Sequence, residues 1–169
     1  MHKKDIKFNI ISLLSAIIMI AIDQVTKILA VNNLSDGPFD IIKGVLQFLY
    51  LENHGAAWGI LAGKRVFFII ITLIVVGLVV AIYLKTPNEK KYIPLIIVQI
   101  MLISGAVGNF IDRLMLGYVR DFIYFELIDF PVFNVADIFV VLSAIVLCFL
   151  ILFVYKDEDL TFLSIKKKE

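Results

Sequence analysis

Four stretches of the chain are apolar over a length that can cross a bilayer. A transmembrane helix needs about 20 predominantly apolar residues. The stretches that approach this length are residues 10–30, 66–84, 93–116 and 135–155. The pattern therefore predicts four membrane-spanning helices. Two longer connections, residues 31–65 and 117–134, then lie on the same side of the membrane.

The positively charged residues set the expected orientation of these spans. Ten of the sixteen Lys and Arg residues flank the spans on the side opposite to the two long connections. They are Lys3, Lys4, Lys7, Lys85, Lys90, Lys91, Lys156, Lys166, Lys167 and Lys168. Because Lys and Arg collect in cytoplasmic segments, we expect both termini in the cytoplasm and both long connections outside it.

The first long connection has the pattern of a β-hairpin. Two apolar runs, "FDII" and "VLQFLYLE", stand on either side of Lys43–Gly44, and a glycine between such runs favours a turn. Two interpretations stay open: a hairpin packed on the helix ends, or a cradle that lies on the bilayer and holds an extended peptide along its edge. The expected fold class is a mainly α membrane protein, with four transmembrane helices and a small extracytoplasmic β-sheet.

Composition agrees with a membrane protein. Apolar residues make up 61% and charged residues 18% of the 169, with a mean hydropathy of +0.97. A soluble domain is about half apolar and about a quarter charged, so we expect residues 1–169 to form a single integral membrane domain. The net charge of +1 argues against nucleic acid as a partner. The one cysteine, Cys148, is expected to be a small buried apolar side chain.

Polar residues interrupt the first span and mark its outer end. In "DQVTK", Asp23 and Lys27 stand four residues apart and share a helix face. Charged groups within a span usually face the protein interior or water. The two side chains could form an ion pair that holds the bundle together, or they could bind the head group of a substrate.

Two further motifs combine small residues with polar ones. In "SGAVGNFIDR", the small residues allow close helix contact, while Asn109 and Arg113 share a face and could hold carboxylates or substrate carbonyls. Asp112 beside Arg113 could be an ordinary pair at the membrane boundary. "ENHGAAWG" offers either hydrogen bonds from Asn53 or a tight entry into the second span. A metal site at His54 is disfavoured, since the other histidine is expected on the far side.

The segment "VRDFIYFELIDFPVFNVAD" carries four acidic residues. Asn134 and Asp137 are placed to cap the fourth helix, which would account for them without chemistry. Capping does not account for Asp121. Two carboxylates in close proximity tend to share one proton. The ionised one can then take a proton from a water that attacks a peptide carbonyl, while the protonated one donates to the carbonyl oxygen. Spacing alone leaves open whether Asp121 and Asp137 meet.

Five motifs in order, "DQVTK", "NHGAAWG", "SGAVGNFIDR", "VRDF" and "FNVAD", resemble the bacterial lipoprotein signal peptidase family (signal peptidase II). The resemblance covers nearly the whole chain. It implies a membrane aspartic endopeptidase that cleaves prolipoproteins just before a diacylglyceryl-modified cysteine, with Asp121 and Asp137 as the catalytic pair. It implies further that ten residues support the pair or the substrate: Asp23, Lys27, Asn53, Gly55, Gly105, Gly108, Asn109, Arg113, Asn134 and Ala136.

The resemblance also bears on partners and location. It implies lipid-modified prolipoproteins and membrane lipids as partners, no cofactor, a monomer, and a bacterial cell membrane with the site near its outer face. One departure is Ser104, which stands where the family usually has glycine. Two alternatives remain, a small four-helix ion-coupled transporter and a non-catalytic membrane scaffold. The tail from Lys156 onward is expected to be a disordered cytoplasmic end that touches lipid.

Overall fold

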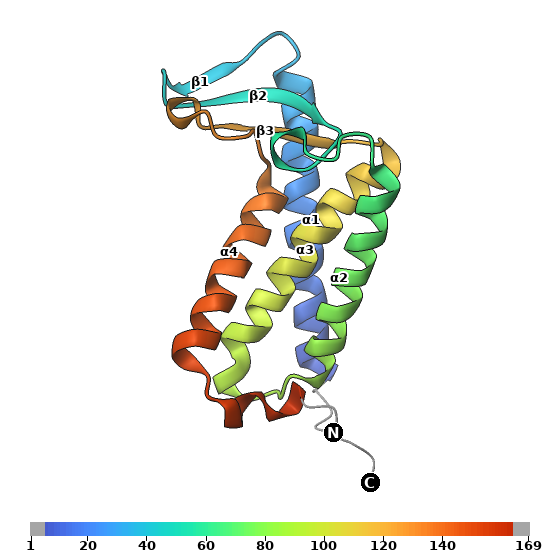
Figure 1. The fold of residues 1–169 in the computed structure, drawn as a ribbon, viewed down its shortest axis with the longest axis vertical. Coiled ribbons are helices and arrows are strands. Elements are labelled where there is room, and N and C mark those ends of the chain that lie inside the picture. Colours follow the sequence, from blue (N-terminus) through green and yellow to red (C-terminus); the bar gives the residue numbers. More distant parts are fainter. Residues whose placement is uncertain (1–5, 164–169) are drawn as a thin grey trace.

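The computed structural model describes residues 6–163, and within them four long helices form a bundle. They are α1 (Ile6–Asn33), α2 (Arg65–Lys85), α3 (Ile93–Met115) and α4 (Val135–Phe149), which continues as a π-helical segment, Leu150–Val154. The helices run side by side, and a small sheet lies across one end of the bundle (Figure 1). Each helix is long and apolar enough to cross a membrane. The predicted fold class is confirmed.

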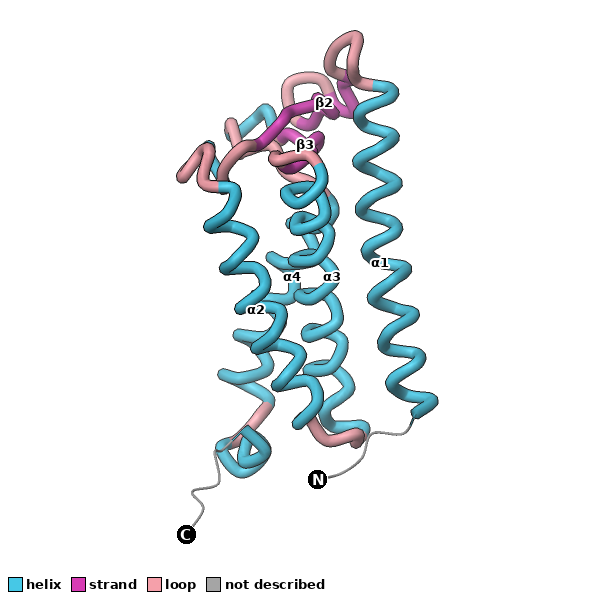
Figure 2. Tube along the Cα trace, turned by 90° about the vertical axis from the view of Figure 1, so that its right-hand side faces the viewer, coloured by secondary structure: helices cyan, strands magenta, loops and turns pink. Residues whose placement is uncertain are grey.

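Helix α1 is longer than the predicted span 10–30. Its 28 residues rise about 42 Å at 1.5 Å per residue, more than the ~30 Å of a hydrocarbon core. Its last turns rise beside the strands, so that α1 flanks the sheet as well as the bundle (Figure 2). Helix α1 is thus long enough to extend past a hydrocarbon core at the sheet end of the bundle.

The sheet has three antiparallel strands in the order β1-β2-β3. The strands are β1 (Phe39–Ile42), β2 (Leu46–Asn53) and β3 (Val119–Tyr124). The predicted hairpin is confirmed: β1 and β2 flank a turn in which Gly44 has a φ of +74°, a conformation that glycine adopts without strain. The third strand was not predicted. Its pairing places Asp121 opposite Leu51 of β2.

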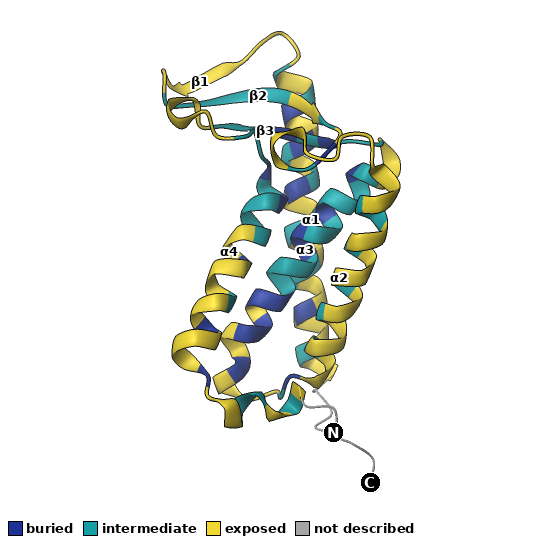
Figure 3. Cartoon of the chain, viewed as in Figure 1, coloured by how far each residue is buried: buried dark blue, intermediate teal, exposed yellow. Residues whose placement is uncertain are grey.

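Helix α3 is the centre of the bundle, since it packs against each of the other three helices. Its buried face includes Ser104, Gly105 and Gly108, and Figure 3 shows the buried positions concentrated along it. Helix α2, in contrast, has no buried residue. A largely apolar helix that leaves most of its side chains uncovered by protein is suited to a lipid environment.

Two sequence expectations are wrong. Cys148 is exposed, because α4 packs on α3 along one stripe and leaves its other apolar side chains on the surface. The tail is ordered up to Leu163: residues Asp157–Leu163 form a 3-10 helix, and the Phe162 ring packs edge-on against Tyr92. Lys91 forms an ion pair with Asp159 there. The remaining tail residues, 164–169, lie outside the described part.

Close contact between α3 and α4 gives a test of the fold. A Cβ added at Gly105 would lie 2.8 Å from Val140 Cγ2 and would collide with the carbonyl oxygen of Ala136. We expect Gly105→Ala to destabilise the protein by about 1–3 kcal/mol, the usual cost of overpacking. Gly77→Ala in α2 is the matched control, because nothing lies within 4 Å of its added Cβ. That control should be neutral or stabilising by up to about 1 kcal/mol. Thermal unfolding in detergent measures both, and equal effects of the two substitutions would contradict the packing described.

Candidate active site

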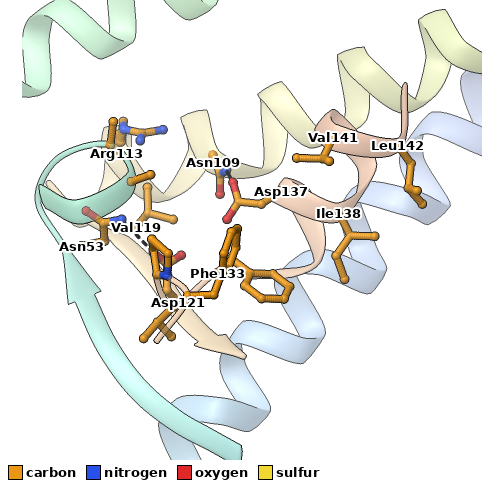
Figure 4. Close-up of a pocket in the computed structure, with 15 residues that line it drawn as sticks. Asn53, Asn109, Arg113, Val119, Asp121, Phe133, Asp137, Ile138, Val141 and Leu142 are labelled. Carbon is orange, nitrogen blue, oxygen red and sulfur yellow. Dashed lines mark hydrogen bonds between the residues drawn. The ribbon is translucent and has the colours of Figure 1, made fainter. Parts of the chain in front are cut away.

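A cavity of about 390 Å³ opens at the sheet end of the bundle. Polar side chains from four elements line it: Asn53, Asn109, Arg113, Asp121 and Asp137. Figure 4 shows Asp121 on β3 and Asp137 on α4 facing the same space. The two aspartates selected from the sequence therefore meet at one site, although 16 positions separate their numbers.

Asp121 is held by two asparagine amides. Its side chain accepts hydrogen bonds from Asn53 Nδ2 at 2.8 Å and from Asn134 Nδ2 at 2.6 Å, one on each carboxylate oxygen. The orientation of each side-chain amide is fixed against a flip, because Asn53 Oδ1 accepts the Gly55 N–H and Asn134 Oδ1 accepts the Asp137 N–H. Each asparagine is thereby fixed with its NH₂ group toward Asp121.

Asp137 has two roles in the structure. Its Oδ2 accepts the Asn134 N–H at 3.1 Å, which completes a capping box at the start of α4. Its Oδ1 accepts Asn109 Nδ2 at 2.7 Å. The capping interpretation of the sequence is therefore confirmed, and the same carboxylate lines the cavity. Asn134 joins the two aspartates directly, since it contacts both.

The surroundings of Asp121 favour its protonated form. Burial, together with the nearby charge of Asp137, raises the pKa of the Asp121 carboxyl to about 7, against the opposing hydrogen bonds from Asn53 and Asn134. A buried carboxyl loses the hydration that stabilises its charge. Asp121 thus titrates near neutral pH, the range in which a carboxyl can serve as a proton donor or acceptor.

Behind the cavity lies a network of buried charges. Lys27 Nζ is 3.0 Å from Asp23 Oδ2 and 3.4 Å from Asp112 Oδ2, and all three side chains are fully buried. Lys27 also donates to Asn109 Oδ1 at 2.8 Å. The predicted Asp23–Lys27 ion pair is therefore present. Its ammonium group fixes the orientation of Asn109, which in turn donates to Asp137.

The two network aspartates hold the backbone beside the two cavity aspartates. Asp23 Oδ1 accepts the N–H of Ala136 at 2.9 Å, one residue before Asp137. Asp112 Oδ2 accepts the N–H of Arg120 at 2.9 Å, one residue before Asp121. The network therefore fixes the position of the start of α4 and of β3 relative to each other.

Sequence reasoning missed the partner of Asp112. That carboxylate binds the Arg120 guanidinium, with Nη2 at 2.7 Å and Nε at 3.2 Å, and does not pair with Arg113. Gln24 completes the cluster, since it accepts from Arg120 Nη2 at 2.9 Å and donates to Asp23. Two features of the sequence could have indicated this cluster: Gln24 is a polar residue inside an apolar span, and Arg120 directly precedes Asp121.

Arg113 reaches toward the cavity as its shared face with Asn109 predicts. Its Nη2 donates to the Gly55 carbonyl at 3.1 Å, and its guanidinium stands 4.7 Å from the centre of the Phe68 ring. Both contacts hold the cation beside the two carboxylates. His54, in contrast, is 57% exposed on its side chain and lies 4.0 Å from Glu52. Within residues 6–163, no three His, Cys, Asp or Glu side chains group as metal ligands.

The two helical glycines pack where larger residues would clash with the site. A Cβ on Gly108 would lie 2.5 Å from Asp23 Oδ2 and 3.2 Å from Ala136 Cβ. Gly105 lies one turn below, against the carbonyl of Ala136. The predicted site residues thus fall into two layers. Asn53, Asn109, Arg113, Asp121 and Asp137 line the cavity, and Asp23, Lys27, Gly105, Gly108, Asn134 and Ala136 lie directly behind it. Gly55 lies beside the cavity, where its N–H holds Asn53.

Comparison with known proteins agrees with this geometry. The family model described as signal peptidase (SPase) II matches residues 15–153. The lipoprotein signal peptidase of Streptococcus pyogenes serotype M5 (strain Manfredo) is 39% identical over 149 residues, which is 86% of this chain and 93% of that protein. The serotype M3 protein (strain SSI-1) is 38% identical over the same shares of the two chains.

Solved structures give the same result. One bacterial membrane enzyme, determined by the in meso method at 2.3 Å, superposes with a TM-score of 0.78 at 33% identity and covers 100% of this chain and 99% of its own. A second, at 1.9 Å, has a TM-score of 0.76 at 35% identity, covering 92% of this chain and 99% of its own. With its family model, its relatives and its fold in agreement, the chain belongs to the signal peptidase II family.

Proposed function

We propose that this protein is an aspartic endopeptidase that removes signal peptides from lipid-modified prolipoproteins, with Asp121 and Asp137 as its catalytic pair. The observation that carries the proposal is the shared cavity: a buried carboxyl group on a strand and a partly buried one at a helix start are fixed by asparagines on the wall of one space. The substrate class follows from the lipoprotein signal peptidases that the chain resembles over 86% of its length.

The surroundings of the two carboxyl groups suggest which one holds the proton. Asp137 caps the N-terminus of α4, where the helix dipole and the Asn134 N–H favour an ionised carboxylate. Asp121 has a pKa of about 7 because of burial, so it carries the shared proton at neutral pH. In this assignment Asp137 is the base and Asp121 the acid.

Cleavage then follows from proton transfers between these groups, water and substrate. Asp137 takes a proton from a water molecule as the water oxygen attacks the scissile carbonyl carbon, and Asp121 gives its proton to the carbonyl oxygen. The tetrahedral intermediate collapses as the C–N bond breaks. Asp137 returns its proton to the leaving amine, and Asp121 takes one back from a hydroxyl of the intermediate, which restores both groups.

Substrate binding uses the remaining walls of the cavity. Arg113 has N–H groups beyond the one donated to Gly55 and lines the cavity, so it can donate to a substrate carbonyl. On the α4 side the wall is apolar: Ile138, Val141 and Leu142. These side chains belong to a helix that is apolar enough to span a membrane, and they suit a signal sequence or the acyl chains of the modified cysteine. The ion-coupled transporter is not supported, because the buried charges pair with one another at one end of the bundle.

The orientation in the membrane is inferred from charge. Of the six Lys and Arg residues at the sheet end, Lys27 and Arg120 belong to the buried network and Arg113 to the cavity. Only Lys43, Lys64 and Arg65 remain there, whereas ten Lys flank the other ends of the spans in the sequence. Positive residues collect on the cytoplasmic side, so the termini lie in the cytoplasm and the cavity lies near the outer face of a bacterial membrane.

The catalytic pair is tested by removing each carboxyl group. We expect Asp121→Asn and Asp137→Asn each to lower kcat on a diacylated prolipopeptide by on the order of 10³-fold, because each removes one member of an acid–base pair. Asparagine has the size of aspartate, so the variants should still fold, as thermal unfolding in detergent will show. The control Asp36→Asn replaces an exposed acidic residue in a turn and should keep full activity. Full activity of either site variant would refute the pair.

The pH dependence follows from the raised pKa of Asp121. Below about 7 its carboxyl is protonated, and above about 7 the shared proton is lost. We therefore expect kcat/KM to fall about tenfold per pH unit above pH 7, since the general acid is then missing. A profile from pH 5.5 to 9 measures this in the free enzyme. A rate that climbs through pH 7 would mean that the doubly ionised pair is the active form, against the proposal.

Labelling tests the orientation. In a Cys148→Ala background, a single cysteine is introduced by Asp36→Cys at the sheet end or by Asn88→Cys in the connection between α2 and α3, both exposed positions. A maleimide that does not cross membranes should label the first variant in intact cells and the second only after lysis. The reverse result would invert the topology and place the cavity at the cytoplasmic face.

A further inference from the structure

A second cavity, of about 440 Å³, adjoins the first on the side away from the helices. The two cavities share one wall, made of Asn53, Phe130, Pro131 and Val132. Asn53 donates to Asp121, so this second cavity begins one side chain from the proposed catalytic pair. We call it the outer cavity.

The outer cavity differs from the first in what surrounds it. Three segments outside the four long helices supply its lining: the end of β2, residues 54–62, and residues 124–132 from the end of β3 onward. None of the apolar α4 side chains that line the first cavity reaches it. Trp58 forms part of its wall and packs edge-on against Phe130 at 6.2 Å between ring centres. In the proposed orientation, the outer cavity therefore lies on the aqueous side of the first cavity, whose wall includes the membrane-spanning α4.

This arrangement assigns the two halves of a substrate. A peptide cut between Asp121 and Asp137 has two parts. The signal sequence before the cut is embedded in the membrane, and the mature chain after the cut extends into the water outside. The apolar α4 wall suits the first half. The part after the cut must continue from the proposed catalytic pair toward the aqueous side. The outer cavity lies in that direction, beyond Asn53.

The chemistry of the lining sets a preference for that half. Among the described residues that line the outer cavity there are two acidic side chains, Glu52 and Asp129, and neither lysine nor arginine. Glu52 accepts from Tyr50 Oη at 3.2 Å, and Asp129 accepts from Tyr124 Oη at 2.7 Å. Both carboxylates are thereby held in place. A substrate side chain of like charge is repelled there, and one of opposite charge is attracted.

We propose that the outer cavity binds the first residues of the mature lipoprotein, those directly after the lipidated cysteine, and selects against acidic side chains among them. The proposal rests on the proposed function. The cavity defines the site, and Glu52 with Asp129 defines its preference.

The test uses three synthetic diacylated peptides that are identical through the cysteine. The three residues after the cysteine are all serine, all lysine or all aspartate. We expect kcat/KM to be lowest for the aspartate peptide, about fivefold below the serine peptide, which is the size of effect that partly exposed charges give. The lysine peptide should be cleaved at least as well as the serine peptide, and raising the salt concentration should shrink the differences.

Two double variants of equal charge change locate the effect. Glu52→Gln with Asp129→Asn should bring the serine-to-aspartate ratio close to one, and asparagine tolerates the left-handed backbone at position 129, where φ is 45°. Asp36→Asn with Asp40→Asn is the control, since these exposed residues line neither cavity and should leave the ratio at its original value. A ratio of rates is read, so a general loss of activity in a variant cancels.

The outcomes separate this inference from the proposed function. No cleavage of any peptide by the unmodified enzyme would overturn the proposed function. Cleavage of all three at equal rates would leave that function standing and overturn the role of the outer cavity. A discrimination that persists in the Glu52 and Asp129 double variant, or that disappears equally in the control, would show that charge elsewhere on the surface is responsible, and would likewise overturn it.

Discussion

The site depends on one buried cation. Lys27 lies between Asp23 and Asp112 and donates to Asn109, which gives each of its ammonium hydrogens an acceptor. Burying an ion costs several kcal/mol unless its partners compensate for the lost water. Here the two aspartates face two cations, Lys27 and Arg120, so the cluster is formally neutral. The buried charges are all paired only when α1, α3 and β3 are in place together. The cluster therefore favours this one arrangement of the three elements.

A membrane gives this polar cluster more weight than it would have in a soluble protein. An apolar side chain is as favourable in contact with lipid as in contact with another helix. Burial of apolar surface therefore does not select one arrangement of the helices. Helix α2 illustrates this, since it is largely apolar and none of its residues is fully buried. Close packing at Gly105 and Gly108 and the paired charges behind them select the arrangement instead. The most precisely positioned part of the molecule is accordingly the end that carries the cavity.

Periodicity and composition predicted the membrane-spanning helices and the β1–β2 hairpin because those signals are local. The third strand was not predicted, since "VRDFIY" forms a strand only by pairing with β2, about seventy positions earlier in the chain. Asp112 shows the same limit. Its neighbour Arg113 suggested a boundary pair, but the side chains point to different sides of α3, and the partner, Arg120, comes into reach only after the chain turns at Gly117. The predictions for Cys148 and for the tail were wrong for a related reason. Whether an apolar side chain is covered depends on which elements pack against it, and the local sequence does not give those contacts.

The sequence predicted which polar residues gather around the cavity more completely than it predicted the fold around them, because polar groups in an apolar chain are few and each needs a partner. Asp137 shows why structural and chemical interpretations of such a residue need not compete. One of its oxygens caps α4 and the other accepts from Asn109, so the bond that begins the helix also fixes the direction of the carboxylate. Asn134 also has two roles: its side-chain oxygen Oδ1 caps the same helix, and its NH₂ group donates to Asp121. Both oxygens of Asp137 are held by hydrogen bonds, which suits a carboxyl group that must meet a second one within a small cavity. Placing Asp121 on a strand that is clamped by Asp112 one residue earlier meets the same requirement from the opposite wall.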